Sequence, residues 1–308
     1  MQHLRSDIEL SIIIVSYNTR DVIGVCLDSI AQVDQDKTEI FVVDNASTDG
    51  SADFLGQYGA QIHLIANREN KGFAAANNQA IPLCRGRFIL FLNPDIEYLP
   101  ATFGHIISFL DKNPHIGLAG LKTVNPNGSF QESYSRTYPG EQYVTDELSD
   151  LKGGLAWVLG ASMITRREVI GKVGGFDERF FVYGEEQDLC LRIRRAGYEI
   201  GYLDFALVVH LGGQSERTTM VSDVWRKKIL AEYLFYYKHY SPQTIKKIVR
   251  TQSIQAFFRI MTLKVLLPFI RDQRKKVVKE KLMKYETTYD SIRCFLKEKA
   301  LSGKASVI

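Results

Sequence analysis

The chain has 308 residues, of which 45% are hydrophobic and 11% aromatic, so it is long enough to bury a sizeable core. Its four cysteines lie far apart and form no CxxC pair. This spacing argues against a disulfide framework or a zinc site and favours the reducing cytoplasm. The first residues contain no apolar run of the kind that a signal peptide requires.

The net charge of +4 conceals an asymmetry along the chain. Residues 217–308 contain 21 lysines and arginines against 7 acidic residues, whereas the preceding part contains 18 against 28. We therefore expect an acidic body with a basic tail, and contact of the tail with an anionic surface.

The first third of the chain alternates predicted strands with predicted helices. Continuous apolar, β-branched runs predict strands buried on both faces of a parallel sheet, at residues 10–15, 39–43, 62–66 and 88–92. Helical spacing and flanking prolines predict helices at residues 22–30, 73–82 and 101–113. This alternation is typical of an α/β fold with a Rossmann-like, mostly parallel sheet flanked by helices.

The pattern changes further along the chain. Residues 125–154 are rich in turn formers and predict a mobile loop, and order resumes over residues 153–165. A charged amphipathic helix is predicted at residues 186–196. Beyond about residue 226, helical periodicity replaces the alternation. We therefore expect an α/β domain over residues 1–225 and a basic, amphipathic helical extension over residues 226–308.

Two polar segments are expected at the edge where such sheets bind ligands. One follows a predicted strand, and the other begins a predicted helix. Asp44, in VVDNASTDGS, can accept a hydrogen bond from a nucleobase imide or a ribose hydroxyl. The alternative is that Asp44 or Ser47 caps the next helix, and the strand-edge position favours nucleotide binding. Small residues in NKGFAAAN (residues 70–77) suit phosphate at a helix start, although a tightly packed helix explains them equally well.

Asp95 emerges from the fourth predicted strand in FILFLNPDIE. A carboxylate there can hold Mg²⁺ or Mn²⁺ against a bound pyrophosphate, whereas the alternative is a surface turn set by Pro94. His210 follows the apolar run 206–209 and precedes two glycines. It is a candidate ligand for the same metal or for phosphate, and a structural histidine is its alternative role.

Three carboxylates, Glu185, Glu186 and Asp188, gather at the start of a predicted helix. One of them is a candidate general base that takes the proton from an acceptor hydroxyl. The alternatives are stabilisation of the helix dipole and i,i+4 ion pairs with the arginines of residues 192–195.

The helical extension has an apolar stripe followed by a basic run. The stripe is formed by Ile254, Phe257, Phe258, Met261 and Val265. Basic residues interrupt it, so it is too short for a membrane span. We expect either an interfacial helix on anionic lipid or a hairpin packed on the first domain or on a second subunit. No nucleic-acid-binding module accompanies the charge.

Taken in order, these motifs resemble glycosyltransferase family 2 over about residues 9–215. The motifs are SIIIVSYN, VVDNASTDGS, NKGFAAANNQA, FLNPDI, WVLGASMITRREVIGKVGGFDERFF, YGEEQDLCLRIRRAGY and HLGGQS. The Asn-Pro-Asp form and the Trp-x-x-Gly-Ala element are similar to those of rhamnosyltransferase-type enzymes of bacterial polysaccharide assembly.

The resemblance implies a GT-A catalytic domain over residues 1–225. It also implies inverting transfer of a sugar, rhamnose being one candidate, from a dTDP- or UDP-sugar to a hydroxyl of a glycan or lipid-linked acceptor. The nucleotide-binding positions that it implies are Ser16, Asn18, Asp44, Asn70, Gly72 and Asn93. The sugar and acceptor pocket that it implies contains Trp157, Gly160, Ala161 and Glu185. Divalent metal is assigned to Asp95 and His210, and the catalytic base to Glu186 or Asp188.

Two departures from the family pattern affect these assignments. Asn93 replaces the first aspartate of the DxD motif, and Glu186 replaces an aspartate at the base position, where we prefer it to Asp188. A non-catalytic relative that binds nucleotide sugar or glycan stays an alternative, as does a sugar nucleotidyltransferase, although residues 16–20 lack the glycines the latter needs. We expect a cytoplasmic protein, peripheral on the inner membrane or homodimeric through its tail, with no nucleic-acid partner.

Overall fold

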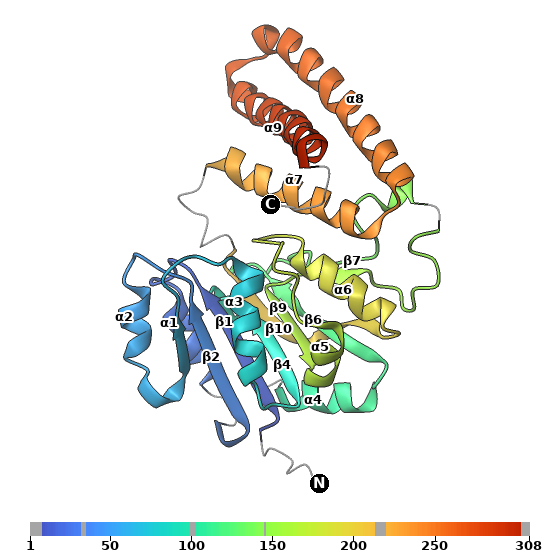
Figure 1. Cartoon of the computed structure of the whole chain (residues 1–308). Helices are drawn as coiled ribbons and strands as arrows, with labels where there is room; N and C mark the ends of the chain where they lie inside the picture. Colours follow the sequence, from blue (N-terminus) through green and yellow to red (C-terminus); the bar gives the residue numbers. More distant parts are fainter. Residues whose placement is uncertain (1–7, 32–34, 99–102, 145, 213–219, 303–308) are drawn as a thin grey trace. The chain divides into compact units, whose positions relative to one another are not determined.

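The computed structural model of the chain describes residues 8–31, 35–98, 103–144, 146–212 and 220–302. The chain divides into two compact units (Figure 1). The first unit contains residues 1–138, 150–181 and 185–217, and the second contains residues 139–149, 182–184 and 218–308. Of the last predicted motif, HLGGQS, residues 213–215 lie outside the described part.

An eight-stranded sheet forms the centre of the first unit, in the order β3-β2-β1-β4-β9-β6-β10-β5. Its strands are β1 (Leu10–Ser16), β2 (Thr38–Asp44), β3 (His63–Ala66), β4 (Phe88–Leu92), β5 (Ile96–Tyr98), β6 (Ile116–Val124), β9 (Ser162–Arg166) and β10 (Glu199–His210). A separate pair consists of β7 (Tyr134–Ser135) and β8 (Trp157–Val158). The four strands predicted from apolar runs are confirmed to within two residues.

The direction of the strands determines which loops share an edge of the sheet. The first four strands in the order are parallel to one another, β6 and β10 form a second parallel pair, and β9 is antiparallel to both β4 and β6. The carboxyl ends of β1, β2, β4, β6 and β10 therefore lie along one edge, where β9 begins. Ligands of α/β sheets bind at this edge.

Helices cover both faces of this sheet (Figure 1). They are α1 (Ile23–Ile30), α2 (Ser51–Gly56), α3 (Phe73–Ala80), α4 (Phe103–Lys112), α5 (Arg167–Val173) and α6 (Glu185–Arg195). Ile12 and Ile14 of β1 pack with α1, α2 and α4, whereas Ile13 and Val15 pack with α3, α5 and α6. Each such buried side chain contributes roughly 1.5–3 kcal/mol of transfer free energy. This two-sided burial explains why the strand is apolar throughout.

Short 3₁₀ helices and irregular segments connect these elements. The 3₁₀ helices are η1 (Gln35–Lys37), η2 (Gly59–Gln61), η3 (Ile81–Leu83), η5 (Glu141–Tyr143) and η7 (Leu267–Phe269). The helix predicted at residues 73–82 becomes 3₁₀ after Ala80 because Pro82 carries no N–H. Residues 101 and 102 of another predicted helix lie outside the described part. The predicted loop of residues 125–154 contains β7 and η5 and so has more regular structure than expected.

Three long helices dominate the second unit: α7 (Val221–His239), α8 (Pro242–Leu266) and α9 (Asp272–Ser302). Helix α9 packs against both α7 and α8. The Ser241 hydroxyl accepts a hydrogen bond from Thr244 N–H at the start of α8, and Glu147 accepts from Ser241 N–H and the Thr244 hydroxyl. These bonds satisfy donors that a helix N-terminus leaves free. Within the described residues, no helix is long and apolar enough to cross a membrane.

Candidate active site

Asp44 is the last residue of β2, and only one of its two carboxylate oxygens accepts a hydrogen bond. Its Oδ2 accepts a hydrogen bond from Ser47 N–H at 3.1 Å, whereas its Oδ1 is buried and has no hydrogen-bond partner. Neither Asp44 nor Ser47 caps a helix, because α2 begins after Gly50 without a side-chain cap. The predicted capping alternative is therefore wrong. A buried oxygen without a partner costs about 1–3 kcal/mol, and a ligand N–H or O–H would remove that cost.

Ser16 and Asn18 connect the loops that surround Asp44. The Ser16 hydroxyl lies 2.8 Å from that of Thr19. Asn18 adopts a left-handed conformation, with φ of 52°, which asparagine tolerates better than most residues. Its N–H donates to Ser47 Oγ, and its Oδ1 accepts from Thr48 N–H at 2.8 Å. These side chains fix the loop after β1 to the loop after β2.

Asn70 and Gly72 belong to a loop that the Asn45 side chain holds next to Asp44. Asn45 Nδ2 donates to Asn70 Oδ1 at 2.8 Å, and Asn45 Oδ1 accepts from Lys71 N–H at 3.0 Å. Gly72 has a φ of +82°, and a Cβ there would lie 2.5 Å from the Phe181 carbonyl oxygen. Close packing is thus a sufficient reason for this glycine.

Asp95 and His210 are brought together from distant parts of the chain. Asp95 lies in the turn between β4 and β5, His210 ends β10, and both are at least nine-tenths buried. Asp95 Oδ1 lies 3.4 Å from His210 Nε2. On the other side of the ring, His210 Nδ1 lies 3.0 Å from Gln131 Oε1. No sequence motif singled out Gln131, because its relation to His210 exists only in the folded chain.

The pair of Asp95 and His210 fits a divalent ion that shares its coordination with a ligand. A carboxylate oxygen and an imidazole nitrogen face each other, and this mixed donor set suits Mn²⁺ better than Mg²⁺. Among the described residues, no group of three or more histidine, cysteine, aspartate or glutamate side chains is arranged to hold a metal. An ion at this pair therefore needs further oxygen ligands from a diphosphate or from water.

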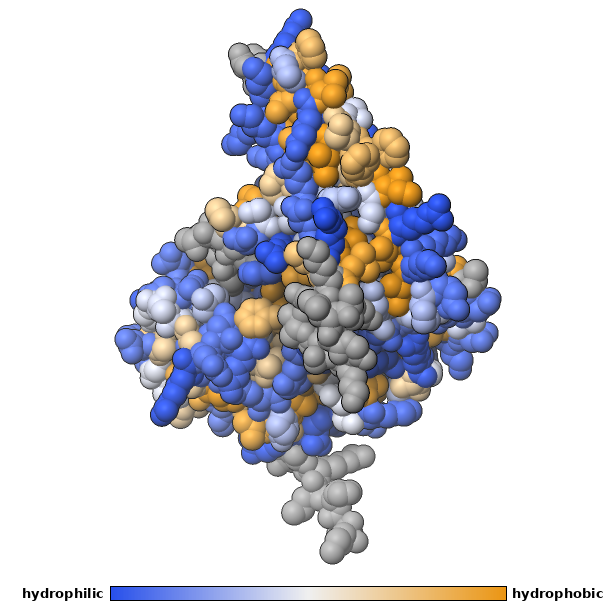
Figure 2. All heavy atoms as spheres, turned by 45° about the horizontal axis from the view of Figure 1, so that its top comes forward, coloured by the Kyte–Doolittle hydropathy of each residue, from blue (hydrophilic) through white to orange (hydrophobic). Residues whose placement is uncertain are grey.

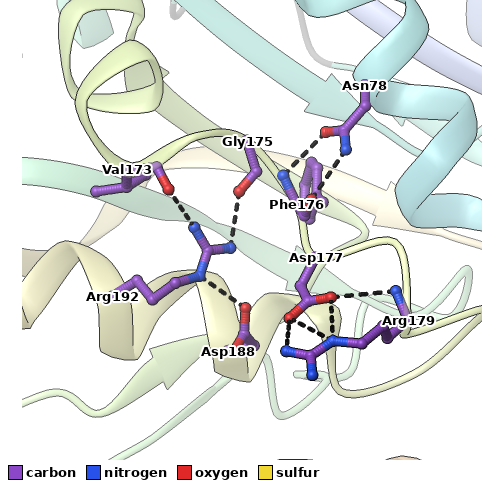
Figure 3. A network of polar contacts seen from close by, with 8 residues as sticks. All are labelled: Asn78, Val173, Gly175, Phe176, Asp177, Arg179, Asp188 and Arg192. Carbon is purple, nitrogen blue, oxygen red and sulfur yellow. Dashed lines mark hydrogen bonds and ion pairs between the residues drawn. The ribbon is translucent and has the colours of Figure 1, made fainter. Parts of the chain in front are cut away.

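Asp188 is committed to an internal ion pair. Its side chain is fully buried, and its Oδ2 accepts from Arg192 Nε at 2.8 Å. Figure 3 shows the Arg192 guanidinium between this carboxylate and the carbonyl oxygens of Val173 and Gly175, to which it donates at 2.8 and 2.7 Å. This is the predicted i,i+4 ion pair, and it gives Asp188 a structural role.

Glu185 and Glu186 open α6 and are both buried. Glu185 Oε2 has no hydrogen-bond partner. Burial, together with the neighbouring Glu186 charge, raises the pKa of Glu185 well above its usual value. The site therefore favours a neutral Glu185 beside Glu186. Glu186 borders Gly160, where an added Cβ would lie 3.6 Å from the Glu186 Cβ.

The segment between β8 and β9 connects Glu186 to the turn that contains Asp95. Trp157, half-buried in β8, donates from Nε1 to the Thr137 carbonyl at 3.1 Å. The Ala161 carbonyl, directly after Gly160, accepts from Asn93 N–H at 2.8 Å. Glu186, Gly160, Ala161 and Asn93 thus form a chain of contacts along the edge of the sheet.

Asp44 lies further along the same edge. The Asp44 strand, β2, pairs with β1, and β1 pairs with β4, which leads into Asn93. Adjacent strands are about 4.8 Å apart, so the ends of β2 and β4 are separated by roughly 10 Å. The structure therefore brings Asp44, the Asp95–His210 pair and Glu186 to one edge of one sheet.

The chain matches a known protein family. The model described as "Glycosyl transferase family 2" matches residues 11–174, slightly more than half of the chain. The match includes β1, β2 and β4 and their polar turns, and it ends before α6 and β10.

Curated relatives are similar at low identity. N-acetylglucosaminyl-diphospho-decaprenol L-rhamnosyltransferase of Mycobacterium tuberculosis is 24% identical over 231 residues, which span 65% of this chain and 75% of that protein. The O-antigen biosynthesis protein RfbC of Myxococcus xanthus is 27% identical over 78% of this chain, but the match spans only 20% of RfbC.

Solved structures share the fold. The mannosyltransferase PcManGT of Pyrobaculum calidifontis, solved in complex with GDP-Man and Mn²⁺, superposes with a TM-score of 0.55 at 16% identity, covering 97% of this chain and 77% of that one. S. aureus TarS 1–349 in complex with UDP gives a TM-score of 0.52 at 17% identity, covering 97% and 93%. The predicted GT-A fold is confirmed.

Proposed function

Because the chain belongs to glycosyltransferase family 2, we propose that it transfers a sugar from a nucleoside diphosphate to a hydroxyl of a glycan or lipid-linked acceptor in cell-surface polysaccharide synthesis. The observation that carries this proposal is the meeting of Asp44, the Asp95–His210 pair and Glu186 at the carboxyl edge of the sheet. These groups supply the three functions that transfer requires: recognition of the nucleotide, neutralisation of the leaving diphosphate and removal of a proton.

The donor that Asp44 favours is a UDP- or dTDP-sugar. Only its Oδ1 is free, since Oδ2 accepts from Ser47 N–H. Uracil and thymine each offer a single imide N–H, which matches one free oxygen, whereas guanine presents two adjacent donors. The L-rhamnosyltransferase among the relatives supports rhamnose as the sugar. Ser16, Asn18, Asn70 and Gly72 contribute by holding the nucleotide loops, with Asn93 at the diphosphate end.

Asp95 and His210 are the residues that would hold Mg²⁺ or Mn²⁺. Such an ion stabilises negative charge on the departing diphosphate. With Asn93 in place of a second aspartate, the described residues supply two candidate ligands, Asp95 and His210, so we expect metal to bind tightly only together with the nucleotide. The Mn²⁺ in the PcManGT complex supports the use of a divalent ion in this proposal.

Glu186 is the proposed base. The acceptor oxygen forms a bond to the anomeric carbon as the bond from that carbon to the diphosphate oxygen breaks, and the hydroxyl proton passes to the Glu186 carboxylate. A single displacement of this kind inverts the anomeric configuration. Asp188 is unsuited to the role because its carboxylate is fully buried and paired with Arg192. The sugar and acceptor pocket in this proposal is bordered by Trp157, Gly160, Ala161 and Glu185.

The experiment that tests the transfer is a donor screen on the purified chain. Thermal shifts are measured with UDP-, dTDP- and GDP-sugars, with and without Mn²⁺, and donor turnover is then followed with candidate acceptors. We expect stabilisation by one pyrimidine nucleotide sugar, increased by Mn²⁺ and lost in Asp44→Ala. Binding without turnover would support the non-catalytic relative, and synthesis of a nucleotide sugar from a nucleoside triphosphate would support the nucleotidyltransferase.

We further propose that the extension of residues 226–308 lies on an anionic membrane surface while residues 1–225 carry out the transfer. The apolar side chains of α8 and η7 are largely exposed: Ile254, Phe257, Phe258, Met261, Val265, Leu266 and Phe269 are between 46% and 83% accessible. Figure 2 shows hydrophobic side chains gathered among hydrophilic ones on the surface of these helices.

The charge of the extension favours lipid over a second copy of the chain as the partner of this apolar face. Exposed Arg259 interrupts the face, as does Lys264, which pairs with Glu286 at 2.8 Å, and the exposed Arg271 and Arg274 follow it. Anionic headgroups attract such residues, whereas a second copy would bring like charges together. We propose that lipid at this face holds the enzyme next to a lipid-linked acceptor, on the cytoplasmic side of the inner membrane.

A further inference from the structure

The backbone of Gln131 is anchored to the sheet at the end of β6. A turn after β6 is closed by hydrogen bonds from Gly128 N–H to the Asn125 carbonyl and from Asn125 N–H to the Ser129 carbonyl. The returning chain donates from Gln131 N–H to the Thr123 carbonyl at 3.0 Å. Since β6 pairs with β10, this turn carries the Gln131 side chain to the end of β10. Gln131 is thus held by main-chain bonds next to His210.

The contact between Gln131 and His210 determines which ring nitrogen faces Asp95. Gln131 Oε1, 3.0 Å from His210 Nδ1, is a carbonyl oxygen and can only accept a hydrogen bond. Nδ1 is therefore the donor in this contact, and Nε2 is the ring nitrogen that faces the opposite side. Nε2 lies 3.4 Å from Asp95 Oδ1.

An imidazole that is held through one ring nitrogen is oriented to bind a divalent ion through the other. We propose that Gln131 is a positioning residue that holds His210 in the Nδ1–H form and so presents Nε2 to the metal. This inference rests on the proposed role of Asp95 and His210 as metal ligands.

The test measures Mn²⁺ binding directly, by electron paramagnetic resonance titration in the presence of UDP or dTDP. Gln131→Leu removes the acceptor at nearly constant size, Gln131→Glu keeps an acceptor, and Gln57→Leu, at an exposed glutamine of the first unit, is the matched control. We expect Gln131→Leu to weaken Mn²⁺ binding by about 10-fold, as loss of a partner to a metal-binding histidine does. Gln131→Glu and Gln57→Leu should bind as the wild type does.

A second readout requires neither metal nor turnover. Long-range ¹H–¹⁵N spectra of the metal-free chain, with the His210 signals identified from His210→Ala, report the tautomer of the ring. In spectra recorded at a pH where the ¹⁵N shifts report a neutral ring, we expect a protonated Nδ1 in the wild type and in Gln131→Glu, and a mixture of tautomers in Gln131→Leu. If Gln131→Leu does not fold, the wild-type and Gln131→Glu spectra decide the question.

The two proposals fail in different ways. Unchanged Mn²⁺ affinity in His210→Ala would refute the metal site itself. Weakened binding in His210→Ala combined with wild-type affinity and tautomer in Gln131→Leu would refute only the role of Gln131. An unprotonated Nδ1 in the wild-type chain would also overturn that role.

Discussion

The two units of the chain depart from the usual distribution of polar and apolar groups in opposite directions. The first unit buries polar atoms without partners, at Asp44 Oδ1 and Glu185 Oε2. The second exposes apolar side chains along α8 and η7, with Phe258 of α8 64% and Phe269 of η7 83% accessible. Each departure costs free energy in the isolated chain, and a ligand of the matching chemistry would remove the cost. The comparison is consistent with the polar ligand proposed for one unit and the lipid surface proposed for the other.

Replacement of Glu186 by glutamine tests the polar half of the comparison and has the largest expected effect. A glutamine cannot accept the acceptor proton, so we expect the kcat of sugar transfer to fall by about 10³-fold, within the range for loss of a general base. Donor binding, measured by thermal shift, should be unchanged. If the variant keeps its kcat, another residue must be the base.

Asp188→Asn, two residues further along α6, should lower the stability of the protein without lowering its turnover. Removing one partner of a buried ion pair leaves the charge of Arg192 uncompensated. We expect the free energy of unfolding to fall by about 3 kcal/mol, which denaturant titration measures. The kcat of the folded fraction should stay within a few-fold of wild type. Loss of turnover without loss of stability would instead favour Asp188 as the base.

Substitution of two exposed phenylalanines tests the proposed lipid contact of the second unit. The double change Phe257→Ser and Phe258→Ser removes aromatic area from α8, and each phenylalanine that enters lipid contributes roughly 1.5–3 kcal/mol. In vesicle sedimentation with anionic lipid, we expect at least a 10-fold loss of binding. Phe205→Ser, at an exposed phenylalanine of the first unit, is the control and should bind normally.

The dependence on lipid charge and salt sharpens the same test. Wild-type binding should fall with neutral vesicles and with rising salt, because the basic residues beside α8 act through screened attraction. The contrary outcome is a wild-type chain that does not bind vesicles and is oligomeric in light scattering, and that becomes monomeric when the two phenylalanines are replaced. That result would show that a second copy of the chain covers this face.

Glu185→Gln should increase stability in a manner that depends on pH. The folded chain raises the pKa of Glu185, so it favours the protonated form. There is no penalty below the unfolded pKa, and stability falls as pH rises above it toward the folded pKa. Glutamine removes this loss, worth about 1.4 kcal/mol per unit of pKa difference. We expect a higher Tm than wild type at pH 8 and little difference at pH 4.

Replacement of Glu147 in the second unit should lower the stability instead of raising it, and its effect should be the smallest. Hydrogen bonds from Thr244 and Ser241 lower the pKa of Glu147 to about 2. Its stabilisation is therefore present above the unfolded pKa and lost as pH falls toward 2. Because the carboxylate is partly exposed, solvent screening keeps the contribution below about 1 kcal/mol. Glu147→Gln should lower the Tm slightly at pH 7 and not at pH 2.

Local pattern in the sequence determined the elements and their chemistry. The apolar runs identified β1, β2, β3 and β4, because a strand covered on both faces must be apolar at every position. Motif order identified the family and its GT-A fold, since the polar turns must recur at fixed places along that sheet. Short strands such as β7 and β8 were missed, since two residues carry no periodic signal.

Only the tertiary structure decided which polar groups are occupied and which are free. Asp44 and Asp188 are both acidic residues at element ends, yet Ser47 leaves one oxygen of Asp44 open while Arg192 engages Asp188. The contact of Gln131 with His210 spans 79 residues of chain and follows from the pairing of β6 with β10. Sequence specifies which groups can donate and accept, but hydrogen bonds and ion pairs depend on distances of a few ångströms, and these exist only once the sheet has formed.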